Sequence, residues 1–205
     1  MDSGRRVTNV FIAVAVLAMI ALAINVSQRA PAAGKTDMSV LPGLAENLRS
    51  VSKISGYPFE NIRVVRITRT NGDEISVARA DGRSAFKFRG TPPGEDERIA
   101  FSAILYANAA FLDALASADS FVVTAAKPEQ QLGELVYTGF DGFVLENTVF
   151  RADDATWLKM TASYSEKLAE EARNLTGSRL TRDEVDKLVK GLQGRIYKKP
   201  DEPLP

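Results

Sequence analysis

One stretch decides the fold of this 205-residue chain: IRVVRITRTNGDEISVARADGRSAFKFR, residues 62–89. Apolar and polar residues alternate within it in three runs: 62–70, 74–80 and 84–89. Asn71-Gly72 and Asp81-Gly82 separate the runs, and such dipeptides between alternating runs are the strongest short-range signal for a hairpin. The stretch therefore predicts three antiparallel strands joined as a meander.

Alternation also divides the side chains of this stretch between two faces of the sheet. The apolar side chains are expected to share one buried face: Val65, Ile67, Ile75, Val77, Phe86 and Phe88. The polar side chains are expected to point the other way: Arg66, Thr68, Glu74, Ser76, Lys87 and Arg89. The sheet should therefore bury one face and leave the other one polar.

Outward from this stretch, period-2 and period-3.6 patterns predict further strands and helices. Strands are predicted at 134–138, 143–151 and 156–164, with a short one at 195–197. Helices are predicted at 98–115, 165–175 and 181–192, and 45–54 predicts a short helix or an irregular lead-in. The last long helix opens with a capping box, formed by Thr181 and Glu184.

The order of these elements predicts the fold class. Three strands, a helix, three strands and two helices indicate an α+β domain with a mostly antiparallel sheet of two three-strand meanders. The helices are expected to pack on one face of that sheet. The two halves, 41–126 and 127–198, are candidates for a degenerate repeat.

An apolar run near the N-terminus is long enough to cross a bilayer. Residues 7–26 carry no charge, and as a helix they extend roughly 30 Å, the thickness of the hydrocarbon core. The side chains that predict a transmembrane anchor include these: Val10, Phe11, Leu17, Ile20 and Ile24. The competing interpretation is a cleaved signal peptide, because Ala21-Leu22-Ala23 offers a small-x-small cleavage pattern.

Arg5 and Arg6 precede the run and set the expected topology. The positive-inside rule places residues 1–6 in the cytoplasm and sends the rest of the chain across the membrane. Residues 27–40 are small and polar and predict a flexible tether. The remaining parts are an α+β domain over 41–198 and a disordered tail over 199–205. We expect a single-pass protein of the bacterial inner membrane with its domain in the periplasm.

Composition excludes several functional classes. Lys and Arg total 26 and equal Asp and Glu, which argues against a broadly basic nucleic-acid binder. The chain has no Cys and no His. It therefore lacks disulfides, thiolate nucleophiles, imidazole-based triads and the usual zinc ligands. We predict no cofactor and no metal.

Two imidazole-free chemistries remain, and both have plain structural explanations. Glu95-Asp96-Glu97 and Asp153-Asp154 offer carboxylates, yet neither has the alternating ligand spacing of a calcium loop. Charge at a helix start and a solvated turn explain them. Ser52-Lys53 and Ser165-Glu166-Lys167 lack the Ser-x-x-Lys spacing of an activated serine. No residue is therefore assigned a catalytic role.

Aromatic residues of the second meander are the remaining candidates for a surface that grips a partner or a glycan. Sheet alternation places many of them in the core. Phe140, Phe143 and Trp157 are the partner-binding candidates. Phe140 deserves a separate test because it lies inside a turn, where burial is hard to arrange.

Several segments, taken in order, resemble a family of bacterial single-pass membrane proteins. They include Leu41-Pro42-Gly43-Leu44, the hairpin around Asn71-Gly72, Tyr137 to Gly142, Trp157 to Met160, and Gly191 to Tyr197. That family carries a domain of unknown function and is often encoded beside a gliding-motility-type ABC transporter. The resemblance implies an accessory role at an envelope transporter, with inner-membrane transporter subunits as partners, and it supplies no catalytic residues.

The sequence thus predicts a membrane-anchored periplasmic accessory or binding protein that is not an enzyme. Its contacts would be with the bilayer, through one helix, and with a transporter assembly rather than nucleic acid. The alternative is an imidazole-free envelope hydrolase or glycan-binding protein that uses carboxylates or a Ser/Lys pair. A cleft lined by convergent carboxylates would favour that alternative.

Overall fold

The computed structural model describes residues 40–117, 130–152, 155–177, 179–192 and 195–198. All of them belong to one compact unit, which extends over residues 38–205. The predicted anchor of residues 7–26, the arginines at positions 5 and 6, nearly all of the tether and the predicted tail lie outside the described residues.

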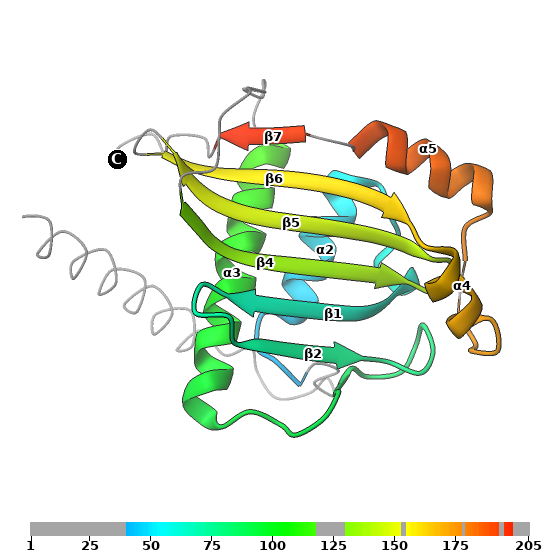
Figure 1. Ribbon diagram of the computed structural model, residues 1–205, viewed down its shortest axis with the longest axis horizontal. Helices are drawn as coiled ribbons and strands as arrows, with labels where there is room; N and C mark the ends of the chain where they lie inside the picture. The colour runs from blue at the N-terminus through cyan, green and yellow to red at the C-terminus, as the bar shows by residue number, and fades with distance from the viewer. Residues whose placement is uncertain (1–39, 118–129, 153–154, 178, 193–194, 199–205) are drawn as a thin grey trace, which may run out of the picture. The chain divides into compact units, whose positions relative to one another are not determined.

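The described domain is an α+β structure built on a seven-stranded antiparallel sheet (Figure 1). The strands are β1 (Ile62–Arg69), β2 (Glu74–Ala78), β3 (Lys87–Phe88), β4 (Gln130–Gly139), β5 (Phe143–Ala152), β6 (Ala155–Tyr164) and β7 (Arg195–Lys198). Their order across the sheet is β3-β2-β1-β4-β5-β6-β7. The two predicted meanders are therefore halves of one sheet, and the pairing of β1 with β4 joins them.

The first hairpin matches its prediction closely, but the third strand is much shorter than expected. β1 and β2 pair around Asn71-Gly72 with Val65 opposite Val77. β3 has only two residues because the Asp81 side chain accepts hydrogen bonds from the backbone N–H groups of Arg83 (2.8 Å) and Ser84 (2.7 Å). Those bonds form a local turn in place of strand pairing.

Four α-helices and one 3₁₀ helix accompany the sheet: α2 (Leu44–Ser55), η1 (Phe59–Asn61), α3 (Glu95–Ser117), α4 (Glu166–Ala172) and α5 (Arg182–Leu192). α2 and α3 lie against each other behind the sheet, while α4 and α5 lie at the end where β6 finishes (Figure 1). The segment at 45–54 is therefore a helix rather than an irregular lead-in.

α3 is the one described helix that is long and apolar enough to cross a bilayer, and it lies in the middle of the chain. Many of its large apolar side chains are buried in the core of the domain, including Phe101, Leu105, Phe111, Leu112 and Leu115, whereas Ile99 near its start is exposed. Burial of this kind is typical of the central helix of a globular domain. The apolarity of α3 is thus explained by packing against the sheet.

The core occupies the space between the sheet and the helices. The face predicted to be buried is confirmed: Val65, Ile67 and Val77 are fully buried, Phe86 nearly so, and Ile75 and Phe88 pack against them. Each helix element except α4 and η1 contributes a large buried side chain to this core, such as Leu48, Leu112 and Val185. Burial of such side chains supplies the main stabilisation of the domain.

Candidate functional site

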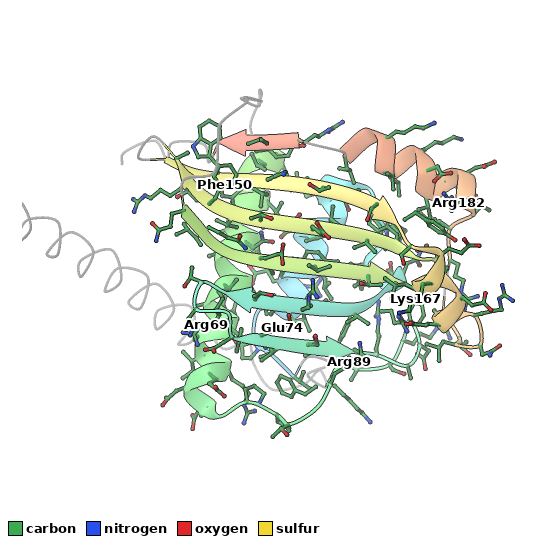
Figure 2. All side chains as sticks on the ribbon, in the orientation of Figure 1. Arg69, Glu74, Arg89, Phe150, Lys167 and Arg182 are labelled. Carbon is green, nitrogen blue, oxygen red and sulfur yellow. The ribbon has the colours of Figure 1, made fainter. Side chains whose placement is uncertain are left out.

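A pocket of about 260 Å³ lies at the end of the sheet between α4 and the start of α5. Its lining is dominated by charged side chains of both signs: Asp141, Glu166, Glu170, Arg173, Arg179 and Arg182. Apolar atoms of Phe140, Tyr164, Ala169 and Leu180 complete the wall. Figure 2 shows Arg182 and Lys167 at this end of the sheet and Phe150 at the opposite end.

Asp141, in the turn between β4 and β5, is the buried carboxylate of this pocket. Its side chain accepts three hydrogen bonds: from the Tyr57 hydroxyl (2.7 Å) and the Phe143 backbone N–H (3.1 Å) on Oδ1, and from the Leu180 backbone N–H (3.0 Å) on Oδ2. Hydrogen bonds to an ionised acceptor are stronger than neutral ones. Asp141 therefore fixes the wall of the pocket by tying together three segments that are distant in sequence.

Tyr57 supports Asp141 from inside the domain. Its ring stacks on Phe143 with centroids 4.2 Å apart. Burial, and next the negative charge of Asp141, raise the pKa of the Tyr57 hydroxyl well above its usual value, so the group is a neutral donor at physiological pH. The pair is thus a proton-bearing phenol that donates to a carboxylate, an arrangement that holds structure together.

The tight approach of Tyr57 and Asp141 depends on a glycine. A Cβ added at Gly139 would lie 1.9 Å from the Tyr57 hydroxyl oxygen and 2.5 Å from Asp141 Oδ1. Contacts this short require Tyr57 or Asp141 to shift, so a side chain at position 139 would disturb the pair. Gly142 has φ of 85°, and a Cβ there would meet the Ser165 carbonyl oxygen at 2.5 Å. Close packing around Asp141 therefore requires glycine at both ends of the Gly139-Phe140-Asp141-Gly142 turn.

The three arginines of the pocket are held in different ways. Arg173 pairs with Glu170 along α4. Arg179 donates from Nη2 to the carbonyl oxygens of Ala172, Arg173 (3.1 Å) and Leu175 (2.9 Å) at the end of α4, where the last carbonyl groups lack N–H partners within the helix. The Ala172 carbonyl also accepts from the Leu175 backbone N–H (2.9 Å).

Arg182 is fixed from two sides. Its Nε donates to Asp186 Oδ1 (2.9 Å), and its guanidinium carbon lies 3.5 Å from the centroid of the Tyr164 ring. The hydrogen bond with Asp186 raises the pKa of Arg182 above its already high value. The pocket therefore presents permanently charged guanidinium groups whose orientation is set before any ligand arrives.

All three predicted partner-binding aromatics are buried. Phe140 and Phe143 have exposures of 0% and 1%, and Trp157 has 6%. The expectation that Phe140 resists burial is wrong, because the chain after α4 covers its ring: a Cβ at Gly177 would lie 2.7 Å from it. Trp157 packs with Phe150 in a small cluster and donates from its indole N–H to the Ala152 carbonyl oxygen (2.9 Å). Phe143 and Trp157 therefore offer no surface to a partner, and Phe140 contributes only to the lining of the pocket.

The other sequence candidates occupy structural positions. Glu97, in the first turn of α3, accepts a hydrogen bond from the Gly94 N–H (3.0 Å). Ser165 is the N-cap of α4, and Lys167 is exposed. Asp153-Asp154 lies outside the described residues. Within the part of the chain that the structure describes, no group of three or more Asp or Glu side chains could hold a metal ion.

Of the residues that line the pocket, the sequence singled out Phe140 alone as a binding candidate. Asp141 stood only as part of a glycine-bounded turn, and Tyr57, Arg179 and Arg182 carried no pattern. The available signal was the capping box at Thr181, which the structure confirms: Glu184 accepts from the Thr181 N–H at 2.7 Å. The capping box predicts where α5 begins, and so places Arg182. It does not predict which residues face Arg182 across the pocket.

No family model, no curated protein and no solved structure matches this chain. The pocket is therefore interpreted from its own geometry.

Proposed function

We propose that this chain is a membrane-anchored accessory protein whose periplasmic domain binds a protein partner. The pocket supports a binding role, because its charges are already fixed by hydrogen bonds and ion pairs within the domain. Preorganised charges favour recognition, since little conformational entropy is lost when a partner arrives. This pocket is the observation on which the proposal depends.

The anchor belongs to the same proposal. The uncharged run of residues 7–26 would form an N-terminal transmembrane helix, and Arg5 and Arg6 would keep the N-terminus in the cytoplasm. Anchoring confines the domain to the membrane surface and raises its effective concentration for neighbours there. Together with the family resemblance, this favours subunits of an ABC-type transporter assembly as partners.

Co-purification from native membranes tests this function. Membranes would be washed with high salt and then carbonate, the full chain extracted in mild detergent, and chemically cross-linked partners identified by mass spectrometry. We expect the chain to resist both washes and to recover integral transporter subunits. A matched control is the double variant Leu17→Arg with Ile20→Arg, which should leave the bilayer and lose those partners. Release of the wild-type chain by salt alone would contradict the proposal.

An imidazole-free hydrolase or glycan-binding protein is a second candidate, favoured by the three carboxylates Asp141, Glu166 and Glu170 that line one pocket. General acid/base hydrolysis needs two such groups near the substrate. Asp141 already accepts three hydrogen bonds and Glu170 is paired with Arg173, whereas Glu166 has neither kind of contact among the described residues. Hydrolysis of envelope glycans by the wild-type chain, lost in Glu166→Gln, would support this candidate.

A further inference from the structure

Three arginines line the pocket, and Arg179 and Arg182 are the two that more than one described contact holds in place. Arg179 has no carboxylate partner among the described residues, and only its Nη2 is engaged with backbone carbonyls. Arg182 shares its charge with Asp186, yet Nε alone makes that contact. Each guanidinium thus keeps N–H donors for a ligand, since the group carries five.

Both guanidinium groups are held in place, which is the property a recognition site needs. The end of α4 holds Arg179, and the Tyr164 ring and Asp186 hold Arg182. Leu180, which stands between the two arginines, is fixed to Asp141 through its backbone N–H (3.0 Å). The buried Asp141–Tyr57 pair therefore sets the position of the segment that carries both arginines. Guanidinium groups ordered in this way bind oxyanions with little further loss of side-chain entropy.

We infer that Arg179 and Arg182 bind a carboxylate carried by a polypeptide partner, with the flanking apolar part of that partner against Ala169 and Leu180. This inference deepens the proposed function, on which it rests. The lining carries three carboxylates and three guanidinium groups and so has no net positive charge to balance a phosphate group, which carries nearly two negative charges; a singly charged carboxylate suits it better. The volume of about 260 Å³ lies below the range of ordinary small-ligand sites, so the pocket fits a side chain with its neighbours.

A panel of blocked pentapeptides provides the probe. Each peptide has a central Asp or Glu flanked by Leu, and each is matched by its Asn or Gln counterpart. Binding to the full chain in detergent micelles would be measured by titration calorimetry and by the NMR shift of the Leu180 amide. We expect the acidic peptides to bind at least tenfold more tightly than their amide counterparts. Equal binding of the two sets, or no binding at all, would overturn the inference.

Variants localise the effect. Arg182→Gln and Arg179→Gln should each weaken acidic-peptide binding at least fivefold. Glu166→Gln should strengthen it, because one repelling charge is removed. The matched control is Arg151→Gln, an exposed arginine near the opposite end of β5, which should change nothing. Since Arg179 also caps α4, Arg182→Gln and Arg182→Lys keep the test valid if the Arg179 variant unfolds. If Arg151→Gln weakens acidic-peptide binding as much as Arg182→Gln does, the peptides are attracted non-specifically to positive charge, and the inference is wrong.

Two further experiments distinguish a carboxylate ligand from phosphate, and failure of this inference from failure of the proposed function. Inorganic phosphate and free acetate, titrated under the same conditions, should bind more weakly than the acidic peptides; tighter binding of phosphate would assign the pocket to a phosphorylated ligand instead. The membrane co-purification is then repeated with Arg182→Gln. If the wild-type chain and this variant recover the same partners equally, the inference fails while the proposed function stands. If the wild-type chain recovers no membrane partner, the proposed function fails whatever the peptides do.

Discussion

The domain contains two buried polar clusters, each centred on a tyrosine, and they differ in the charge of the group that receives the hydroxyl. Tyr137 donates to the amide oxygens of Asn47 (2.6 Å) and Asn108 (3.3 Å), between α2, α3 and β4. Tyr57 donates to the carboxylate of Asp141 (2.7 Å). The first cluster is neutral and enclosed, whereas the second contains an anion and reaches the pocket.

Only the Tyr57 cluster can pass a structural change from the core to the pocket. Asn47 also donates to the Leu105 carbonyl (3.1 Å) and to Asn108 (2.9 Å), so the Tyr137 cluster ties two helices to one strand within the core. Asp141 instead ties the core to the loop that carries Arg179 and Arg182. A change at Tyr137 should therefore alter stability alone, while a change at Asp141 should alter stability and the pocket together.

Asp141→Ala is expected to have the largest effect. It leaves the Phe143 and Leu180 N–H groups without their acceptor, and it leaves the buried Tyr57 hydroxyl with only the Asn61 carbonyl oxygen, at 3.4 Å. Each stranded buried donor costs about 1–3 kcal/mol, so we expect a loss of about 3–5 kcal/mol in the free energy of unfolding. Urea unfolding, followed by the fluorescence of the single tryptophan, Trp157, measures it. Asp141→Asn keeps one acceptor oxygen, which can serve the two bonds made by Oδ1, and should lose about half as much. A loss below about 1 kcal/mol in Asp141→Ala would show that the carboxylate is not the organising group.

Alkaline pH should destabilise the domain through both tyrosines. Burial raises the pKa of Tyr57 and of Tyr137 above the unfolded value of about 10. Because the pKa of each tyrosine is higher in the folded chain than in the unfolded chain, only the unfolded chain releases these protons just above pH 10. The stabilisation is therefore fully present below pH 10 and is lost as the pH rises above it. Each tyrosine contributes a slope of about 1.4 kcal/mol per pH unit above that point.

The Tyr57→Phe and Tyr137→Phe variants should each remove one of the two slopes, and the double variant should remove both. Tyrosinate absorbance adds an independent check. Ionisation of either tyrosine in the folded chain near pH 10 would contradict the burial argument.

Gly139→Ala tests the close approach beside Asp141. The added Cβ would press on the Tyr57 hydroxyl and on Asp141 Oδ1. Overpacking of this kind costs about 1–3 kcal/mol. Gly191→Ala is the matched control, because nothing lies within 4 Å of a Cβ there and the residue belongs to α5. It should stabilise the chain by up to about 1 kcal/mol. Thermal unfolding of the two variants should therefore shift in opposite directions.

The sequence predicted local structure well, because the signals for strands and turns depend on residues that are neighbours in the chain. The period-2 runs and the Asn-Gly turn were enough to place β1 and β2, and the capping box placed α5. Phe140 and Asp141 could not be placed in this way. Gly177 covers the Phe140 ring, and the donors to Asp141 include Tyr57, 84 residues away, and Leu180, 39 residues away. The Tyr57 contact depends on the pairing of β1 with β4, and the contacts of Gly177 and Leu180 depend on where the chain runs after α4; no local pattern encodes either.

The smallest expected effect gives the sharpest separation of the two clusters. Tyr57→Phe and Tyr137→Phe each remove one hydroxyl donor from a buried acceptor, and each should cost about 1–2 kcal/mol. Stability alone therefore does not distinguish them. Binding of the acidic pentapeptides should distinguish them. Tyr57→Phe removes one hydrogen bond that fixes Asp141, and Asp141 in turn holds the Leu180 backbone. This variant should therefore weaken binding by about twofold to fivefold. Tyr137→Phe should leave binding unchanged, because its cluster has no member in the pocket lining. If both variants weaken binding equally, the pocket responds to global stability, and the link through Asp141 is not specific.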